Sequence, residues 1–266
     1  ELVSSMNDLG WDVYSFDHED GIGQFEVDFK FFDALSMSDR YVFFRMMAHE
    51  IARKHGAFAT FMPKPYVDRA GSGAHFNMSL ADIKSGKNLF ADDNDPRGCG
   101  LSKLGYQFIA GVLAHLPAIC AVVAPTVNSY KRLVPGFEAP VHISWARNNR
   151  SGLIRVPIPK RDNPMATRIE YRSADPACNP YLAFSLMLAA GMRGVREGYE
   201  LPDEADANLF EIGDDVVDVL DADGQAHVAG RDAAGQLIGG AQLRVRGGGR
   251  MNGERARIAD VGDVIE

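Results

Sequence analysis

The sequence predicts an α+β fold in which a mainly antiparallel sheet is flanked by helices. Short stretches of alternating apolar and polar residues predict strands as far as residue 172. Helical segments separate them irregularly, without the repeated strand–helix–strand units of a parallel sheet. Hydrophobic residues make up 46% of the 266 residues and charged residues 24%, so the chain can bury a core as one large domain or two small ones.

Local signals place the elements in chain order. Alternation predicts two paired strands joined by the glycine-rich turn 21–23, followed by a helix with Ser36 and Asp39 at capping-box spacing. A second long helix is interrupted at Pro117, and a final helix begins at Asn179-Pro180, a suitable N-cap and first-turn pair. The predicted strands cover residues 12–19, 24–32, 57–62, 72–80, 141–146, 152–156 and 168–172, and the predicted helices cover about 38–55, 102–124 and 179–198.

Bulk properties exclude several classes of protein. The net charge of −8 argues against non-specific nucleic-acid binding, which needs a basic face. No apolar run approaches the roughly 18–20 residues that cross a bilayer. Cys99, Cys120 and Cys178 are too few and too scattered for a disulfide framework or a zinc cluster, and we expect reduced thiols in a cytoplasmic protein.

Both ends of the chain are unusual. The first residue is Glu1 and no signal peptide precedes Leu2, so we expect the sequence to be cut from a longer one. The 54 residues from Gly213 contain no aromatic residue and eleven of the 27 glycines. We expect a catalytic-type domain over residues 1–210 and a low-complexity, poorly ordered tail over 211–266. The residue types that dominate the tail are encoded by GC-rich codons, which raises the hypothesis of off-frame translation. Resequencing the gene would test it.

Two glutamates near the first turn form the first candidate site. Strand alternation places Phe25 and Val27 on one face and Glu26 on the other. A hairpin across the glycines would bring Glu19 beside Glu26, where the two carboxylates repel unless a cation lies between them. The alternative is a polar sheet face that simply meets water.

Residues 71–80 repeat this pattern. Here His75, Asn77 and Ser79 alternate with apolar residues and share one strand face. The preceding Gly71 and Gly73 permit tight turns and the close approach of backbone to a ligand. A purely structural histidine is the alternative.

A cationic segment is the third pattern. Residues 147–172 carry +5, which leaves −13 for the rest of the chain. Alternation places Arg168, Glu170 and Arg172 on one face. Arginine's planar guanidinium matches carboxylate and phosphate, so the segment indicates a small anionic ligand, with a solvated charged face as the alternative. Carboxylates, a histidine and clustered arginines together indicate metal-bridged phosphate chemistry.

These segments, in this order, resemble the catalytic domain of glutamine synthetase over about residues 10–205. Five or more motifs in register make the resemblance specific. The matching strings are His18-Glu19, Gly23-Gln24-Phe25-Glu26, Met62-Pro63-Lys64-Pro65, Gly71-Ser72-Gly73-Ala74-His75, residues 128–140, Arg147-Asn148-Asn149-Arg150, Arg155, Arg168-Ile169-Glu170-Tyr171-Arg172, Asp175 and Asn179-Pro180-Tyr181.

The resemblance implies two divalent ions, Mg²⁺ or Mn²⁺, with ATP as co-substrate. Glu19 and Glu26 would hold one ion, while His75 and Glu170 would help to hold the second. The implied reaction converts glutamate to γ-glutamyl phosphate, which ammonia or another small amine then attacks to form the amide.

The resemblance also implies roles in substrate binding and catalysis. Gly71 and Arg132 would bind glutamate, and Arg172 would lie near its γ-carboxylate. Glu138 would sit on a flap over the site and take a proton from the incoming ammonium. The residues implied in ATP binding, of which Arg150 would also contact the transferred group, are Asn77, Ser79, Arg150 and Arg155.

Departures from the family pattern leave the amine open. Ala70 replaces a frequent Asn near glutamate, and Asn77 replaces a usual His near the nucleotide. The strings around Glu19 and Phe25 resemble type III-like glutamine synthetases and the γ-glutamylmethylamide synthetases, which take methylamine. The family's N-terminal β-grasp domain, its first catalytic strand and its C-terminal helices are not recognisable. Because family sites form between subunits of a homo-oligomer, we expect little or no ligase activity from this chain alone.

Two alternatives belong to other classes. The chain could be a non-catalytic descendant that keeps the fold as a structural or interaction protein. A guanidino kinase of related fold is the weaker alternative, because it explains neither Glu138 nor Arg132.

Overall fold

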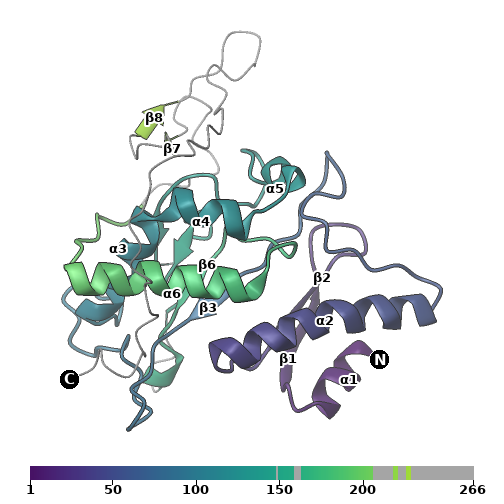
Figure 1. Ribbon diagram of the computed structural model, residues 1–266, viewed down its shortest axis with the longest axis horizontal. Coiled ribbons are helices and arrows are strands. Elements are labelled where there is room, and N and C mark those ends of the chain that lie inside the picture. Colours follow the sequence, from purple (N-terminus) through teal and green to yellow (C-terminus); the bar gives the residue numbers. More distant parts are fainter. Residues whose placement is uncertain (148, 159–162, 206–217, 221–225, 229–266) are drawn as a thin grey trace, which may run out of the picture.

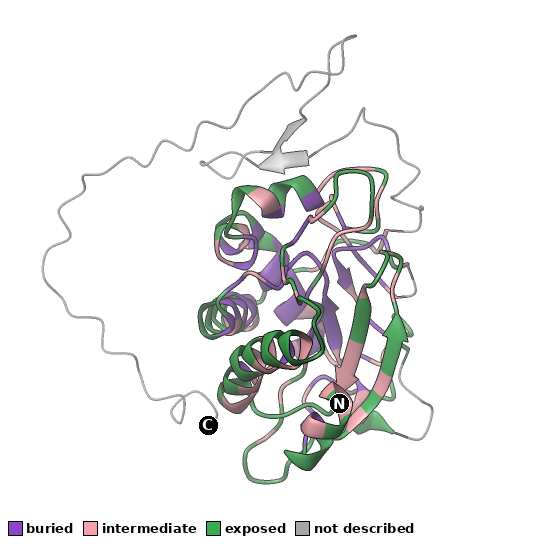
Figure 2. Ribbon diagram, turned by 90° about the vertical axis from the view of Figure 1, so that its right-hand side faces the viewer, coloured by how far each residue is buried: buried purple, intermediate pink, exposed green. Residues whose placement is uncertain are grey.

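The computed structural model describes residues 1–147, 149–158, 163–205, 218–220 and 226–228 (Figure 1). The fold is α+β, as predicted, with one two-stranded and one four-stranded sheet in the main body. Helices α2 and α6 lie on one side of the strands (Figure 2). The four-stranded sheet and the helices packed on it hold the core, whereas the two-stranded sheet is largely exposed (Figure 2).

The first sheet is the predicted hairpin. Helix α1 (Leu2–Asp8) precedes strands β1 (Val13–His18) and β2 (Phe25–Phe29), which pair antiparallel with a bulge at Tyr14. Helix α2 (Ala34–Lys54) then packs against the end of the hairpin through ring contacts of Phe29 and Phe44.

The second sheet has the strand order β3-β6-β5-β4. Its members are short: β3 is Phe76–Met78, β4 is Trp145–Ala146, β5 is Ile154–Arg155 and β6 is Ile169–Tyr171. Strand β6 pairs antiparallel with both β3 and β5, and only β4 and β5 run parallel. The predicted antiparallel preference is confirmed, and every residue of β6 is buried.

Helices cover this sheet. Helix α3 (Lys103–Ala114) packs along α6 (Pro180–Glu197), while α4 is Leu116–Val123, α5 is Val127–Arg132 and a 3-10 turn spans Pro164–Ala166. None of the described helices alone has the length and apolar composition to cross a bilayer. Helices α3 and α4 together do, and the chain bends by 73° between them.

Close helix packing depends on glycine. A Cβ on Gly194 of α6 would lie 2.2 Å from the Gln107 carbonyl oxygen of α3 and 2.6 Å from the Gly111 Cα. The two backbones therefore touch, which any side chain at this point would prevent. Asn179 caps α6 by accepting hydrogen bonds from the amides of Tyr181 and Leu182, as the sequence predicts.

Several local predictions were wrong. Residues 57–62 form no strand, and the strands predicted over 72–80 and 141–146 shrink to β3 and β4. Helix α2 begins four residues early, because Asp33 accepts from the Ser36 amide and replaces the predicted Ser36/Asp39 capping box. The second long helix breaks at His115 rather than Pro117, which fits the first turn of α4 because its missing N–H costs nothing there.

Little of the predicted tail is described. Strands β7 (Asp218–Leu220) and β8 (Ala226–Val228) pair antiparallel. The remaining residues from 206 onward lie outside the described residues, as do Lys160, Arg161 and Asp162 of the cationic segment, so the predicted disorder of the tail stays a prediction.

Candidate functional site

The hairpin brings the two predicted glutamates together. Glu26 pairs directly with Asp17, and Glu19 follows two residues later on the same face. A hydrogen bond to Glu19, partial burial and the charges of Asp28 and Glu170 raise the pKa of Glu26 to about 7, whereas the same bond lowers the pKa of Glu19. Two carboxyl groups that share a proton in this way would release it to a cation.

A buried carboxylate is the centre of the second half of the site. Glu170 of β6 is 5% exposed, and its oxygens accept from Arg155 at 2.7 Å and Arg172 at 2.6 Å. Burial alone would raise its pKa, but Arg172 and the other positive groups outweigh burial and lower it. The face that carries Glu170 and Arg172 is therefore buried and paired, which excludes the solvated alternative.

His75 lies against this carboxylate. Its Nδ1 is 3.3 Å from Glu170 Oε1, and the imidazole is half-buried. Burial and the charge of Arg172 lower the pKa of His75 to about 4, so the ring is neutral near pH 7. Neutral imidazole beside a carboxylate can ligate a metal.

Arg132 of α5 reaches the segment that follows strand β6. It is 4% exposed and donates to the carbonyls of Arg172, Ser173 and Ala174 at 3.0–3.2 Å. Burial lowers the pKa of its guanidinium to about 10. A Cβ on Gly73 would lie 2.6 Å from Arg132 Nη2, so glycine lets the loop approach the guanidinium.

The two halves face one another. The charge of Glu170 contributes to the raised pKa of Glu26, and electrostatic interaction with His75 contributes to the lowered pKa of Glu19. The hairpin pair Glu19/Glu26 and the strand pair His75/Glu170 therefore lie within electrostatic reach of one another and form one candidate site from two sheets.

The remaining predicted residues are less engaged. Arg150 is exposed, and its charge contributes to the lowered pKa of Glu19. Asn77 accepts from Arg168 Nε at 2.8 Å, and Ser79 is exposed on the face that alternation predicts. Glu138 is exposed in the loop after α5, next to Phe137, whose ring carries Lys64 Nζ 3.2 Å from its centroid.

Comparison with known families decides the relationship. The family model described as "Glutamine synthetase, catalytic domain" matches residues 1–221. The chain belongs to the glutamine synthetase family. The match extends beyond residue 205, where the recognisable motifs end.

Individual glutamine synthetases agree. The chain is 45% identical to that of Clostridium saccharobutylicum over 212 residues, which cover 80% of the chain and 46% of the relative. It is 46% identical to that of Methanocaldococcus jannaschii over 215 residues, 81% of the chain and 46% of the relative. The chain thus spans less than half the length of these relatives.

Solved structures extend the match to the fold. A GmaS/ADP complex is 40% identical with a TM-score of 0.72, covering 79% of the chain and 48% of that protein. The glutamine synthetase of Plasmodium falciparum is 35% identical with the same TM-score of 0.72, covering 78% of the chain and 40% of that protein. The predicted fold class and family are confirmed.

Glutamine synthetases use ATP and divalent metal ions, and the donors present suit such ions. Carboxylate oxygens and a neutral imidazole are ligands that Mg²⁺ or Mn²⁺ accepts. The described residues contain no cluster of three or more potential ligands, and each of the pairs Glu19/Glu26 and His75/Glu170 offers two. Both Glu170 oxygens also bind arginine here, and a metal would compete for them.

Three further residues connect loops around the site without having been assigned a role above. Gln24 connects the hairpin with the Gly71 loop, and its only signal was its place in a family string. Lys64, also in a string, is buried and donates to the Arg69 carbonyl. Asn88 donates to the carbonyls of residues 164, 165 and 167, and no motif marks it.

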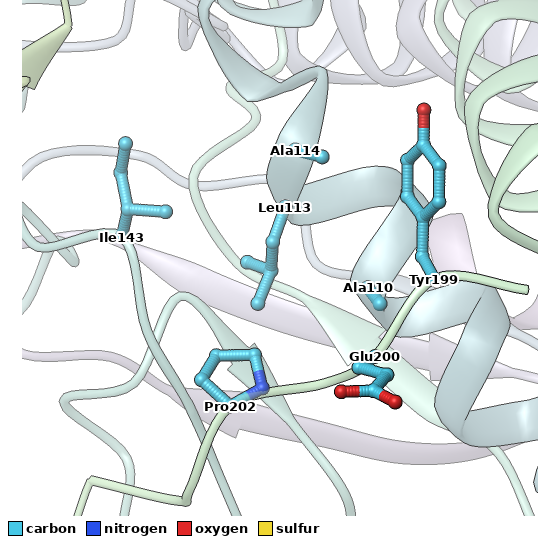
Figure 3. A pocket seen from close by; sticks show the side chains of 7 residues that line it. All are labelled: Ala110, Leu113, Ala114, Ile143, Tyr199, Glu200 and Pro202. Carbon is cyan, nitrogen blue, oxygen red and sulfur yellow. The ribbon is translucent and has the colours of Figure 1, made fainter. Parts of the chain in front are cut away.

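A pocket of about 370 Å³ lies away from this site (Figure 3). The end of α3 and the segment after α6 form most of its wall, with Tyr199, Glu200 and Pro202 along one side (Figure 3). No predicted site residue lines it, so the candidate site is the junction of the two sheets.

Proposed function

We propose that this protein contributes the catalytic half of an ATP-dependent ligase that forms glutamine from glutamate and ammonia through γ-glutamyl phosphate. The observation that carries the proposal is the buried Glu170, bound by Arg155 and Arg172 and in contact with His75, opposite the Glu19/Glu26 pair. Anion-binding and cation-binding groups then meet in one place, as transfer of a phosphoryl group to a carboxylate requires.

The residues of the candidate site would have different roles in this reaction. Divalent ions, when bound, would neutralise phosphate oxygens. Arg155 and Arg172 would stabilise charge on the phosphoryl group, and Arg150 and Asn77, which accepts a hydrogen bond from Arg168, would contact ATP. Glu138, exposed on its loop, would accept a proton from the ammonium ion before attack.

Glutamate binding would use the loop and helix behind the sheet. Gly71 packs its backbone closely against its neighbours, since a Cβ there would lie 2.5 Å from the Pro63 carbonyl oxygen and 3.0 Å from Arg132 Cγ. Arg132 fixes the carbonyls of residues 172–174, and hence the position of Arg172.

Methylamine is the second candidate amine. Ala70 and Asn77 depart from the family pattern, and the match to GmaS has the same TM-score as the match to a glutamine synthetase. The proposal also includes a homo-oligomer and a cytoplasmic location. The three cysteines are free. If neither a divalent cation nor ATP binds, the alternative of a non-catalytic descendant that keeps the fold is favoured.

Ligand-dependent stability tests the proposal. At 100 times its Kd, a ligand specific for the folded state adds about 2.7 kcal/mol, which raises the melting temperature of a domain of this size by roughly 5–10 °C. We expect Mn²⁺ with ATP to produce such a shift in the wild type and in the control Glu50→Gln, which alters an exposed pair with Arg53. Glu26→Gln is expected to lose most of it. No shift in the wild type would contradict the proposal.

An amide-formation assay completes the test. We expect the chain alone to show little or no ATP- and glutamate-dependent amide formation, with ammonia or with methylamine. Turnover by this chain would refute its inactivity, and the amine that supports it would identify the substrate.

A further inference from the structure

Gln24 joins the two halves of the site. It is half-buried at the end of the hairpin turn, and both ends of its side-chain amide are engaged. Its Oε1 accepts from the Gly21 amide at 2.9 Å, within the hairpin. Its Nε2 donates to the Gly71 carbonyl at 2.9 Å, across 47 residues of sequence.

The peptide unit between Gly71 and Ser72 is held from both sides. Gln24 fixes its carbonyl oxygen, and its N–H, which belongs to Ser72, donates to the Pro63 carbonyl at 2.8 Å. Gly71 also has no room to shift toward Pro63. The Gln24 hydrogen bond therefore sets the direction of a backbone group in the proposed glutamate site.

The same residue fixes the carboxylate pair. The Gln24 carbonyl accepts from the Glu19 amide at 3.0 Å, and Glu26 follows two residues later on β2. The hydrogen bond from the Gly21 amide to Gln24 Oε1 stabilises the turn that connects Glu19 with Glu26. One side chain thus holds the hairpin turn and the loop in a fixed relation.

We propose that Gln24 is a positioning residue that holds the cation-binding pair and the Gly71 loop together, so that its loss weakens both the binding of a divalent cation and the binding of glutamate. This inference rests on the proposed function. An amide satisfies both contacts, because Gly21 presents a donor and Gly71 an acceptor, whereas a carboxylate lacks the donor and a thioether lacks it too.

Two substitutions separate the two contacts. Gln24→Met removes both, whereas Gln24→Glu keeps an acceptor for Gly21 and places a second oxygen against the Gly71 carbonyl. The matched control is Gln107→Met on α3, another half-buried glutamine. Each variant is titrated with Mn²⁺ by the electron spin resonance of the free ion, and with glutamate in the presence of Mn²⁺ and ADP by calorimetry.

We expect Gln24→Met to weaken Mn²⁺ and glutamate binding each by about five- to tenfold, the effect of one lost hydrogen bond. Gln24→Glu is expected to keep Mn²⁺ binding, since it adds a carboxylate beside the pair, but to lose glutamate affinity. ADP affinity, and both affinities in Gln107→Met, are expected to stay within twofold of the wild type.

The outcomes distinguish the inference from the proposed function. Wild-type affinities in Gln24→Met would overturn the inference and leave the proposed function intact. An equal loss in Gln107→Met would also overturn it, because the effect would then be general destabilisation. Absence of Mn²⁺ and glutamate binding by the wild type would overturn both.

Discussion

Replacing Gly194 with alanine would force α3 and α6 apart. The added Cβ would lie 2.2 Å from the Gln107 carbonyl oxygen and 2.6 Å from the Gly111 Cα. Heavy atoms need about 3.5 Å, so the helices must separate by roughly 1 Å where they are in closest contact. Both neighbours are backbone atoms, and no change of rotamer relieves the overlap.

The magnitude is the difference between two effects. Overpacking costs about 1–3 kcal/mol, and a clash between backbones lies at the upper end. Alanine recovers about 1 kcal/mol of helix propensity relative to glycine. We therefore expect Gly194→Ala to lower the free energy of unfolding by about 2 kcal/mol, measured by urea denaturation followed by circular dichroism.

Gly105→Ala is the control, and its expected effect has the opposite sign. A Cβ there would meet the Leu101 Cδ2 at 3.2 Å, and this flexible side chain can yield by a few tenths of an ångström. We expect a change between zero and a gain of about 1 kcal/mol. If Gly194→Ala were as stable as the wild type or as Gly105→Ala, the packing argument would be wrong.

Four further predictions concern the site and its support. Without divalent cations, the free energy of unfolding is expected to fall as pH rises from about 4.5 toward 7, because folded Glu26 retains a proton that the unfolded chain releases. Denaturation measured at several pH values is expected to show that this pH dependence is lost in Glu26→Gln. Asn88→Ala removes the donors to three carbonyls and is expected to lower the free energy of unfolding by about 2–3 kcal/mol, measured by urea denaturation. An unchanged free energy of unfolding would contradict this structural role of Asn88. In the full-length enzyme, Arg172→Lys is expected to lower kcat about 10²-fold, since lysine lacks the planar fork, and wild-type turnover would contradict this. Glu138→Ala there is expected to lower the rate of amide formation by about 10² or more while ATP affinity stays constant, and equal loss of both would argue against its role as base.

The alternation of apolar and polar residues correctly predicted which side chains share a strand face where one face of the strand is buried. Alternation correctly separated His75 from the buried Phe76 and placed Glu170 beside Arg172. The Asn179-Pro180 pair correctly marked the start of α6, since its capping chemistry is local. These features depend on residues close in sequence, so a single sequence reveals them.

Features set by distant contacts were not predictable. Strands β4 and β5 are two residues long because pairing, not propensity, decides their ends. The three carbonyl contacts of Arg132 and the role of Gln24 depend on segments about 40 or more residues away. No local pattern encodes them, and only the motifs of the resemblance marked these positions.

The hairpin β1–β2 is a sheet of its own, with side chains such as Tyr14 and Phe25 largely exposed. A two-stranded ribbon with little buried surface opens at a lower free energy than a core strand such as β6. The protein can therefore lose half of the proposed cation site while its core stays folded. On heating, cation binding would fail before the melting transition, and hydrogen exchange would be faster at the amides of the hairpin than at those of β6.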